Sequence, residues 1–132
     1  MVASGNRAWI PAALIVGGIY LFVGRVFALP ADHARAWRLA AWVVSGLAYA
    51  AHLWHEYSKL HRSSRVAAWH VAVAVAIGAF SLAIAGMIHS LSRDASIWAK
   101  WLIALIAWPA ITAIPAYLVA LAAGAVFARA PR

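Results

Sequence analysis

The amino-acid sequence predicts an all-α membrane protein whose four transmembrane helices pack as a bundle of two hairpins, without a soluble domain. Of the 132 residues, 67% are hydrophobic and 11% are charged, whereas a soluble domain carries about 25% charged residues. The charges gather in short groups between long uncharged runs, and about 20 apolar residues suffice for a helix to cross a bilayer. These runs predict helices at about residues 8–29, 35–57, 66–91 and 97–128, within a single domain of residues 1–132.

The first helix is predicted from the apolar run that begins at Ala8 and continues to Leu29. It is long enough to cross the membrane if Arg25, a membrane-embedded basic residue, extends its side chain to the interface. A cleavable signal peptide is the alternative, since a basic residue precedes the run. The run is longer than the apolar core of a usual signal peptide, and Leu29-Pro30-Ala31 is a poor cleavage site. We therefore expect a retained helix.

The second and third helices differ in polarity. In the second, only the 17 residues Leu39–His55 are free of formal charge, whereas Val66–Ser92 gives the third 27 uncharged residues. The third helix is also rich in small residues at helical spacing, which let helix backbones approach closely in lipid. We therefore expect it at the centre of the bundle, packed through the rows Ala68, Ala72, Ala76, Ala79, Ala83 and Ala74, Gly78, Gly86.

The fourth helix is predicted from the 28 uncharged residues Trp101–Ala128. Pro109 and Pro115 lie inside it, and each removes a backbone donor, which predicts a kink or a local break. We expect Thr112 to help satisfy the carbonyl groups that the prolines free.

Composition and charge restrict the functional classes. The absence of cysteine excludes disulfides, thiolate metal sites and thiol catalysis. The net charge of +8 comes from bases at the helix ends, where lipid headgroups account for them, so we expect the lipid bilayer and no nucleic acid as partner. The positive-inside rule places both termini in the cytoplasm, at a plasma (inner) membrane, by one charge. One side holds the six bases Arg7, Lys59, Arg62, Arg65, Arg129 and Arg132, and the other the five bases Arg25, Arg35, Arg38, Arg93 and Lys100.

The second helix carries the main candidate site. Tyr49, His52 and Glu56 fall on one helical face, with His55 beside them and His70 beyond the basic turn. Ionisable residues inside a membrane indicate a functional site by default. These residues, hereafter the polar stripe, are therefore the main candidates for a functional site.

Two interpretations of the stripe remain open. In the structural one, the helix end lies among the headgroups and Glu56 pairs with Lys59 or Arg62. In the functional one, the stripe faces the bundle interior and finds a partner such as His70 on another helix. We expect His52 to face inward and Glu56 to reach the aqueous rim of the basic turn.

Metal or haem binding is an alternative use of the same residues. His52, His55 and Glu56 could hold a single metal ion, whereas one glutamate in the whole chain excludes a di-iron site within one subunit. A b-type haem could bind between His52 and His70. We expect no cofactor, with haem b as the alternative.

The sequence leaves three functional classes. It shows no phosphate-binding loop, Ser-His-Asp set or paired carboxylates, which favours a protein without enzymatic activity. The small-residue face of the third helix suggests a membrane component or accessory subunit, acting as a homo-oligomer or in a larger complex. Arg25 and Tyr20 could line a pore or bind an anion. Together with the proline-containing fourth helix, they indicate a small transporter or channel instead. A b-haem or metal-binding redox protein is the further alternative.

Overall fold

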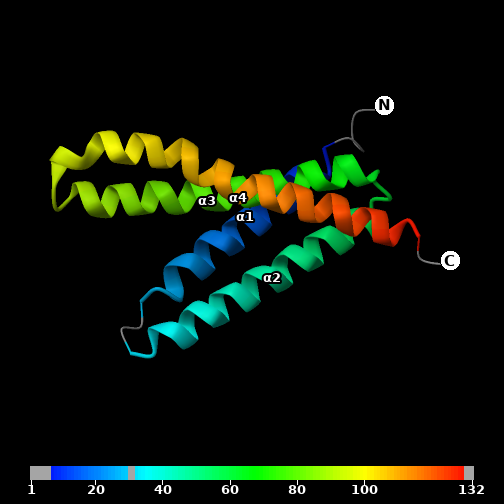
Figure 1. Cartoon of the computed structure of the whole chain (residues 1–132), viewed down its shortest axis with the longest axis horizontal. Helices are drawn as coiled ribbons and strands as arrows, with labels where there is room; N and C mark the ends of the chain where they lie inside the picture. Colours follow the sequence, from blue (N-terminus) through cyan, green and yellow to red (C-terminus); the bar gives the residue numbers. More distant parts are fainter. Residues whose placement is uncertain (1–6, 30–31, 130–132) are drawn as a thin grey trace.

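A computed structural model describes residues 7–29 and 32–129 of the chain. These residues form four long α-helices and one short 3-10 helix, and the described ranges contain no strand. Successive helices run in opposite directions and make two hairpins, α1 with α2 and α3 with α4 (Figure 1). The elements are α1 (Trp9–Val26), α2 (Ala34–Ser58), α3 (Ser64–Leu91), η1 (Ala95–Ile97) and α4 (Trp98–Phe127).

Helix α3 is the centre of the molecule, as its small residues predict. It contacts each of the other three long helices. Close approach depends on missing side-chain atoms: a Cβ added to Gly78 would lie 2.6 Å from the Cβ of Tyr20, and one added to Gly17 would lie 3.2 Å from the carbonyl oxygen of Ala74. The small-residue face of α3 is therefore used inside the chain, against α1 and α4. Its buried residues are Ala67, Ala68, His70, Val71, Ala72, Ala74, Gly78, Ala79 and Ala83.

The two hairpins meet at one end and diverge toward the other (Figure 1). The buried residues of α2 are His52, Leu53 and Glu56, all in its last two turns. Its first half is open, since Trp42 is 78% exposed and Leu47 is 66% exposed. The predicted bundle is thus closed only at the end where α1 begins and α4 ends, because there the side chains of α2 contact α3 and α4.

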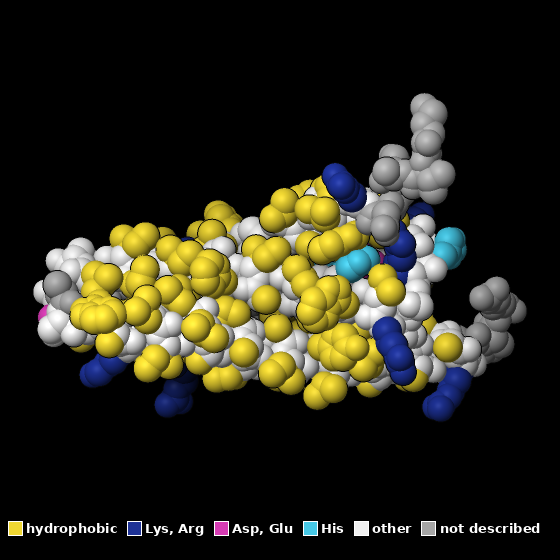
Figure 2. All heavy atoms as spheres, turned by 90° about the horizontal axis from the view of Figure 1, so that it is seen from above, with side chains coloured by type: hydrophobic (Ala, Val, Ile, Leu, Met, Phe, Trp, Pro, Cys, Tyr) yellow, Lys and Arg dark blue, Asp and Glu magenta, His cyan; other side chains and the backbone are white. Residues whose placement is uncertain are grey.

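The molecular surface is apolar along most of its length, with Lys and Arg gathered toward the two ends (Figure 2). Three helices, α1, α3 and α4, are long and apolar enough to cross a membrane. Helix α2 is long enough but more polar, because Arg35, Arg38 and Glu56 and two histidines lie within its 25 residues. Three of the four predicted helices thus have the length and hydropathy that a membrane span needs.

Helix α4 is continuous from Trp98 to Phe127 through both prolines, so the local break predicted there does not occur. The hydroxyl of Thr112 donates to the carbonyl oxygens of Trp108 at 2.9 Å and of Pro109 at 3.1 Å. The prolines free the carbonyls four residues before them, those of Leu105 and Ile111. Thr112 therefore does not serve the freed carbonyls as expected.

Candidate functional site

A buried cluster of one carboxylate and two imidazoles lies at the closed end of the bundle. Its members are Glu56 and His52 of α2 and His70 of α3, hereafter the Glu56 cluster. His52 and Glu56 are four residues apart, which puts them on one face of α2, and α3 begins at Ser64 and brings His70 against that face. Glu56 is 0% exposed, His52 3% and His70 6%. Glutamate is almost never fully buried without a partner, so its contacts are informative.

The contacts of Glu56 are unequal. Nδ1 of His70 lies 2.8 Å from Oε2 of Glu56, and because an ionised carboxylate only accepts hydrogen bonds, Nδ1 is the donor. Nε2 of His52 lies 3.6 Å from Oε1, which is beyond hydrogen-bond distance. Within the part of the chain that the structure describes, Oε1 and both ring nitrogens of His52 have no hydrogen-bond partner. The cluster therefore has one strong hydrogen bond, and it has nitrogen and oxygen atoms on His52 and Glu56 that could take up a proton.

Trp9 covers one face of the cluster. Its ring stacks on that of His70 with centroids 4.3 Å apart and an interplanar angle of 6°. Trp9 is the first residue of α1, so the stack fixes the start of α1 against α3. From the sequence, Trp9 lies at a helix end and is predicted to belong to an interfacial aromatic belt. Its spacing from His70 does not predict that the two rings stack.

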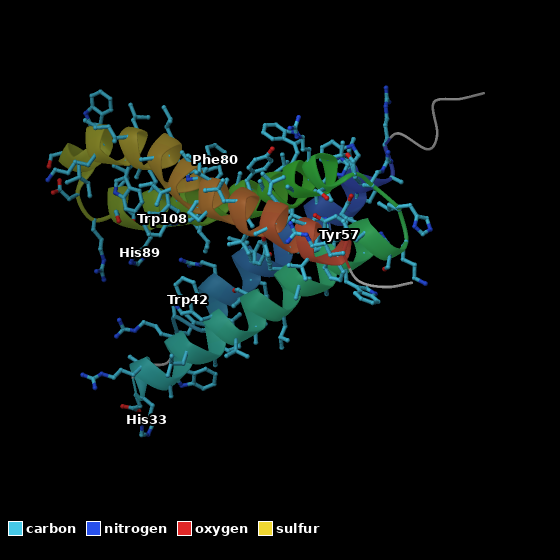
Figure 3. The ribbon with its side chains drawn as sticks, turned by 45° about the vertical axis from the view of Figure 1, so that its right-hand side comes forward. His33, Trp42, Tyr57, Phe80, His89 and Trp108 are labelled. Carbon is cyan, nitrogen blue, oxygen red and sulfur yellow. The ribbon has the colours of Figure 1, made fainter. Side chains whose placement is uncertain are left out.

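Two tyrosines beside the cluster connect α2 to α4. The hydroxyl of Tyr49 donates to the carbonyl oxygen of Ala116 at 2.5 Å, and that of Tyr57 to Ala120 at 3.0 Å. Tyr57 lies at the closed end in Figure 3. Tyr49 thus belongs to the same face as Glu56, as predicted, but its hydroxyl binds the α4 backbone.

The expectation that Glu56 reaches the aqueous rim of the basic turn is wrong. The turn folds back over the end of α2: the backbone N–H of Arg62 donates to the carbonyl of Glu56 at 3.2 Å, and His61 adopts a left-handed conformation with φ of 47°. The first turns of α3 then cover the carboxylate. Its ion pairs in the described part of the chain are with His52 and His70, not with Lys59.

The metal site predicted at His52, His55 and Glu56 does not form. His55 is exposed and does not join the cluster, and across residues 7–29 and 32–129 no group of three His, Cys, Asp or Glu could hold a metal ion. The Glu56 carboxylate lies between the two histidines considered as haem ligands, 3.6 Å from Nε2 of His52 and 2.8 Å from Nδ1 of His70. The exposed His33 and His89 lie at the opposite end of the molecule (Figure 3).

Arg25 and Tyr20, predicted to line a pore or bind an anion, lie apart from the cluster. Arg25 is exposed in the last turn of α1. Tyr20 lines a cleft between the two hairpins, together with Trp42 and Trp108. Its hydroxyl is buried and has no hydrogen-bond partner among the described residues.

Comparison with known proteins gives no relative from which a role for these residues could be transferred. No family model, curated protein or solved structure matches the chain.

Proposed function

We propose that the chain crosses a bilayer four times, with both termini on one side. Helix α2 runs antiparallel to α1 and α3, and its 25 residues give about 37 Å of helix, enough for a hydrocarbon core of about 30 Å. His52 and Glu56 do not oppose insertion, because they are enclosed by protein rather than lipid. Arg35 and Arg38 lie in the first two turns of α2, where long basic side chains extend to the membrane interface. Six basic residues lie on the side of the termini and five on the other side. By the positive-inside rule this difference puts both termini on the cytoplasmic side of a plasma (inner) membrane.

Reporter fusions at the two ends of the chain test this arrangement. Fusions at Met1 and at Arg132, both outside the described residues, should report the same side of the membrane. Opposite sides would mean an odd number of spans. If a reagent outside the cell labels the turn that contains Arg62, the protein has the orientation opposite to the one proposed.

We further propose that the Glu56 cluster is the proton-binding site of a small transporter or channel. The observation that supports this is the complete burial of Glu56 between imidazoles from two different helices. Carboxylates and histidines placed inside membrane proteins are typical of proton relays. Histidine is also the side chain whose charge changes near physiological pH.

The geometry allows protonation to act on the packing of α2. Three titratable groups in contact share their protons as a coupled set, so uptake of one proton redistributes charge over Glu56, His52 and His70. A protonated Glu56 accepts the His70 hydrogen bond less strongly than a carboxylate does. That bond joins α2 to α3, so protonation of Glu56 would weaken one of the links that hold α2 in the bundle.

Proton movement in liposomes tests this function. The purified chain, reconstituted with a pH-sensitive dye inside the vesicles, should speed the collapse of an imposed pH gradient, and Glu56→Gln should remove the effect. The chain has only three acidic side chains, so Asp32→Asn and Asp94→Asn, at exposed positions, are matched controls that should behave as wild type. Equal rates for wild type and Glu56→Gln would contradict the proposal.

A second candidate is a membrane component that works with another copy or another subunit. The small-residue face of α3 no longer argues for it, since α1 and α4 cover that face. The first half of α2 argues for it instead, because Leu39, Trp42, Val43 and Leu47 are all more than 60% exposed on the least apolar of the four long helices. Disulfide crosslinking of Leu47→Cys in membranes should give a dimer if this face binds a second copy. A monomer at every protein density would exclude that contact.

A further inference from the structure

The divergence of the hairpins leaves a cleft that the Glu56 cluster does not use. It has a volume of about 720 Å³ and is lined by residues of all four long helices, within the range of about 300–1,000 Å³ that ligand sites occupy. Trp42 of α2 and Trp108 of α4 are both more than half exposed and lie on its walls (Figure 3). The cleft is therefore open at the surface that the proposed insertion turns toward lipid.

The length of the cleft matches one leaflet of a bilayer. Along α2 its lining runs from Arg38, in the second turn, to Tyr49, just past the middle of the helix. Eleven residues correspond to about 16 Å of helix, and half of a hydrocarbon core is about 15 Å. A chain that enters beside Arg38 therefore ends near the membrane midplane.

The charges at the wide end favour an anionic occupant. Arg38 is the charged residue among those that line the cleft. Its Nε donates to the backbone carbonyl oxygen of Ala34, one turn earlier in α2, at 3.3 Å. Arg25 and Arg35 lie at the same end, against a single acid, Asp32. Among the described residues none of these arginines pairs with a carboxylate. A guanidinium in this position is suited to a phosphate.

We propose that the cleft holds an acyl chain of an anionic phospholipid from the bilayer, with the lipid phosphate bound by Arg38. The apolar walls take the chain, and the arginine selects the headgroup. The proposal rests on membrane insertion but not on proton binding by the Glu56 cluster.

Native mass spectrometry from nanodiscs tests it. The discs contain equal amounts of phosphatidylglycerol and phosphatidylcholine with the same acyl chains, and the lipids retained by the full chain are counted. One arginine near the membrane surface should favour the anionic lipid about fivefold. Arg38→Gln should remove most of this preference, whereas Arg35→Gln, at an exposed neighbour outside the cleft, should keep most of it.

Filling the cleft gives an independent test. Gly46 lines the cleft, and a Cβ added there would meet no atom within 4 Å. Gly46→Trp should therefore fold and retain less of both lipids. Gly18 has the same free space but lies outside the cleft, so Gly18→Trp is the matched control and should retain lipid as wild type does.

The outcomes separate the lipid site from the proposed insertion. Failure of the wild-type chain to enter nanodiscs would overturn the insertion itself. Entry with equal retention of the two lipids, or an equal loss of preference in Arg38→Gln and Arg35→Gln, would overturn the lipid site. If Gly46→Trp retains as much lipid as wild type, the lipid does not bind in the cleft. This variant still tests the proposal if Arg38→Gln does not enter nanodiscs.

Discussion

Replacing His70 by Phe removes the nitrogen that contacts Glu56 but keeps a ring to stack on Trp9. In the wild type the contact is a 2.8 Å hydrogen bond between two buried side chains. His70→Phe leaves the Glu56 carboxylate enclosed with only His52 at 3.6 Å, and breaking a buried ion pair in this way costs about 3–5 kcal/mol. Glu56→Met leaves His70 without its acceptor, which costs about 1–3 kcal/mol.

The double variant distinguishes a direct interaction from two separate defects. With both partners apolar, no buried charge is left unpaired, so the double variant should be more stable than His70→Phe alone. The coupling free energy should be about 1.5–3 kcal/mol, as for hydrogen bonds to charged groups, above the ~0.6 kcal/mol typical of hydrogen bonds between membrane helices. Unfolding of the four proteins in mixed micelles measures it, with His89→Phe at an exposed position of the same helix as control. Additive effects within about 0.5 kcal/mol would refute the pairing of Glu56 with His70.

Three further predictions concern packing, hydrogen bonding and a turn. A Cβ at Gly124 would overlap the Tyr57 hydroxyl and lie 2.6 Å from Oγ of Ser64, so Gly124→Ala should destabilise by about 1–3 kcal/mol in the same unfolding assay; stability equal to wild type would show that the helices adjust freely. Tyr49→Phe loses a bond to α4 and should lose about 0.5–1.5 kcal/mol, whereas Tyr20→Phe removes a hydroxyl with no partner among the described residues and should be neutral or stabilising; the reverse order would refute these assignments. Hydrogen bonds from the Ser96 side chain and, at 2.8 Å, from its backbone N–H lower the pKa of the Asp94 carboxyl below its ordinary value of 3.8. A lowered folded-state pKa stabilises above the ordinary value, and the benefit is lost as pH falls through the folded pKa. Asp94→Ala should therefore lower the melting temperature at pH 7 and converge with wild type in strong acid; a constant difference would exclude this cause.

Much of the helix arrangement is readable from the sequence. The four long helices begin and end within three residues of the predicted bounds, and the largest difference is at α1, which ends at Val26 rather than residue 29. Uncharged runs and small-residue spacing are local signals, and they locate the helices and the central position of α3. The divergence of the two hairpins cannot be predicted from such local signals, because it depends on which residues of α2 contact the other helices.

The candidate site is readable only in part. The spacing of His52 and Glu56 along one helix puts them on a common face, and His70 is close enough in the chain to be named as a partner. The burial of Glu56 is not predicted, because the fold-back of the turn after Ser58 depends on a left-handed His61 that no local pattern requires. The Trp9 stack on His70 joins residues 61 positions apart, and only the packing of α1 on α3 brings them together.

Infrared difference spectroscopy of the carboxyl groups tests proton binding by Glu56 most directly. In an Asp32→Asn/Asp94→Asn background Glu56 is the only acidic side chain left of the three in the chain. Membranes containing this protein should show a side-chain carboxylic acid signal that grows as the pH is lowered, shifts in His70→Phe and is absent after Glu56→Gln. A signal that is unchanged by Glu56→Gln, or no pH-dependent signal at all, would contradict a proton-binding role for the Glu56 cluster.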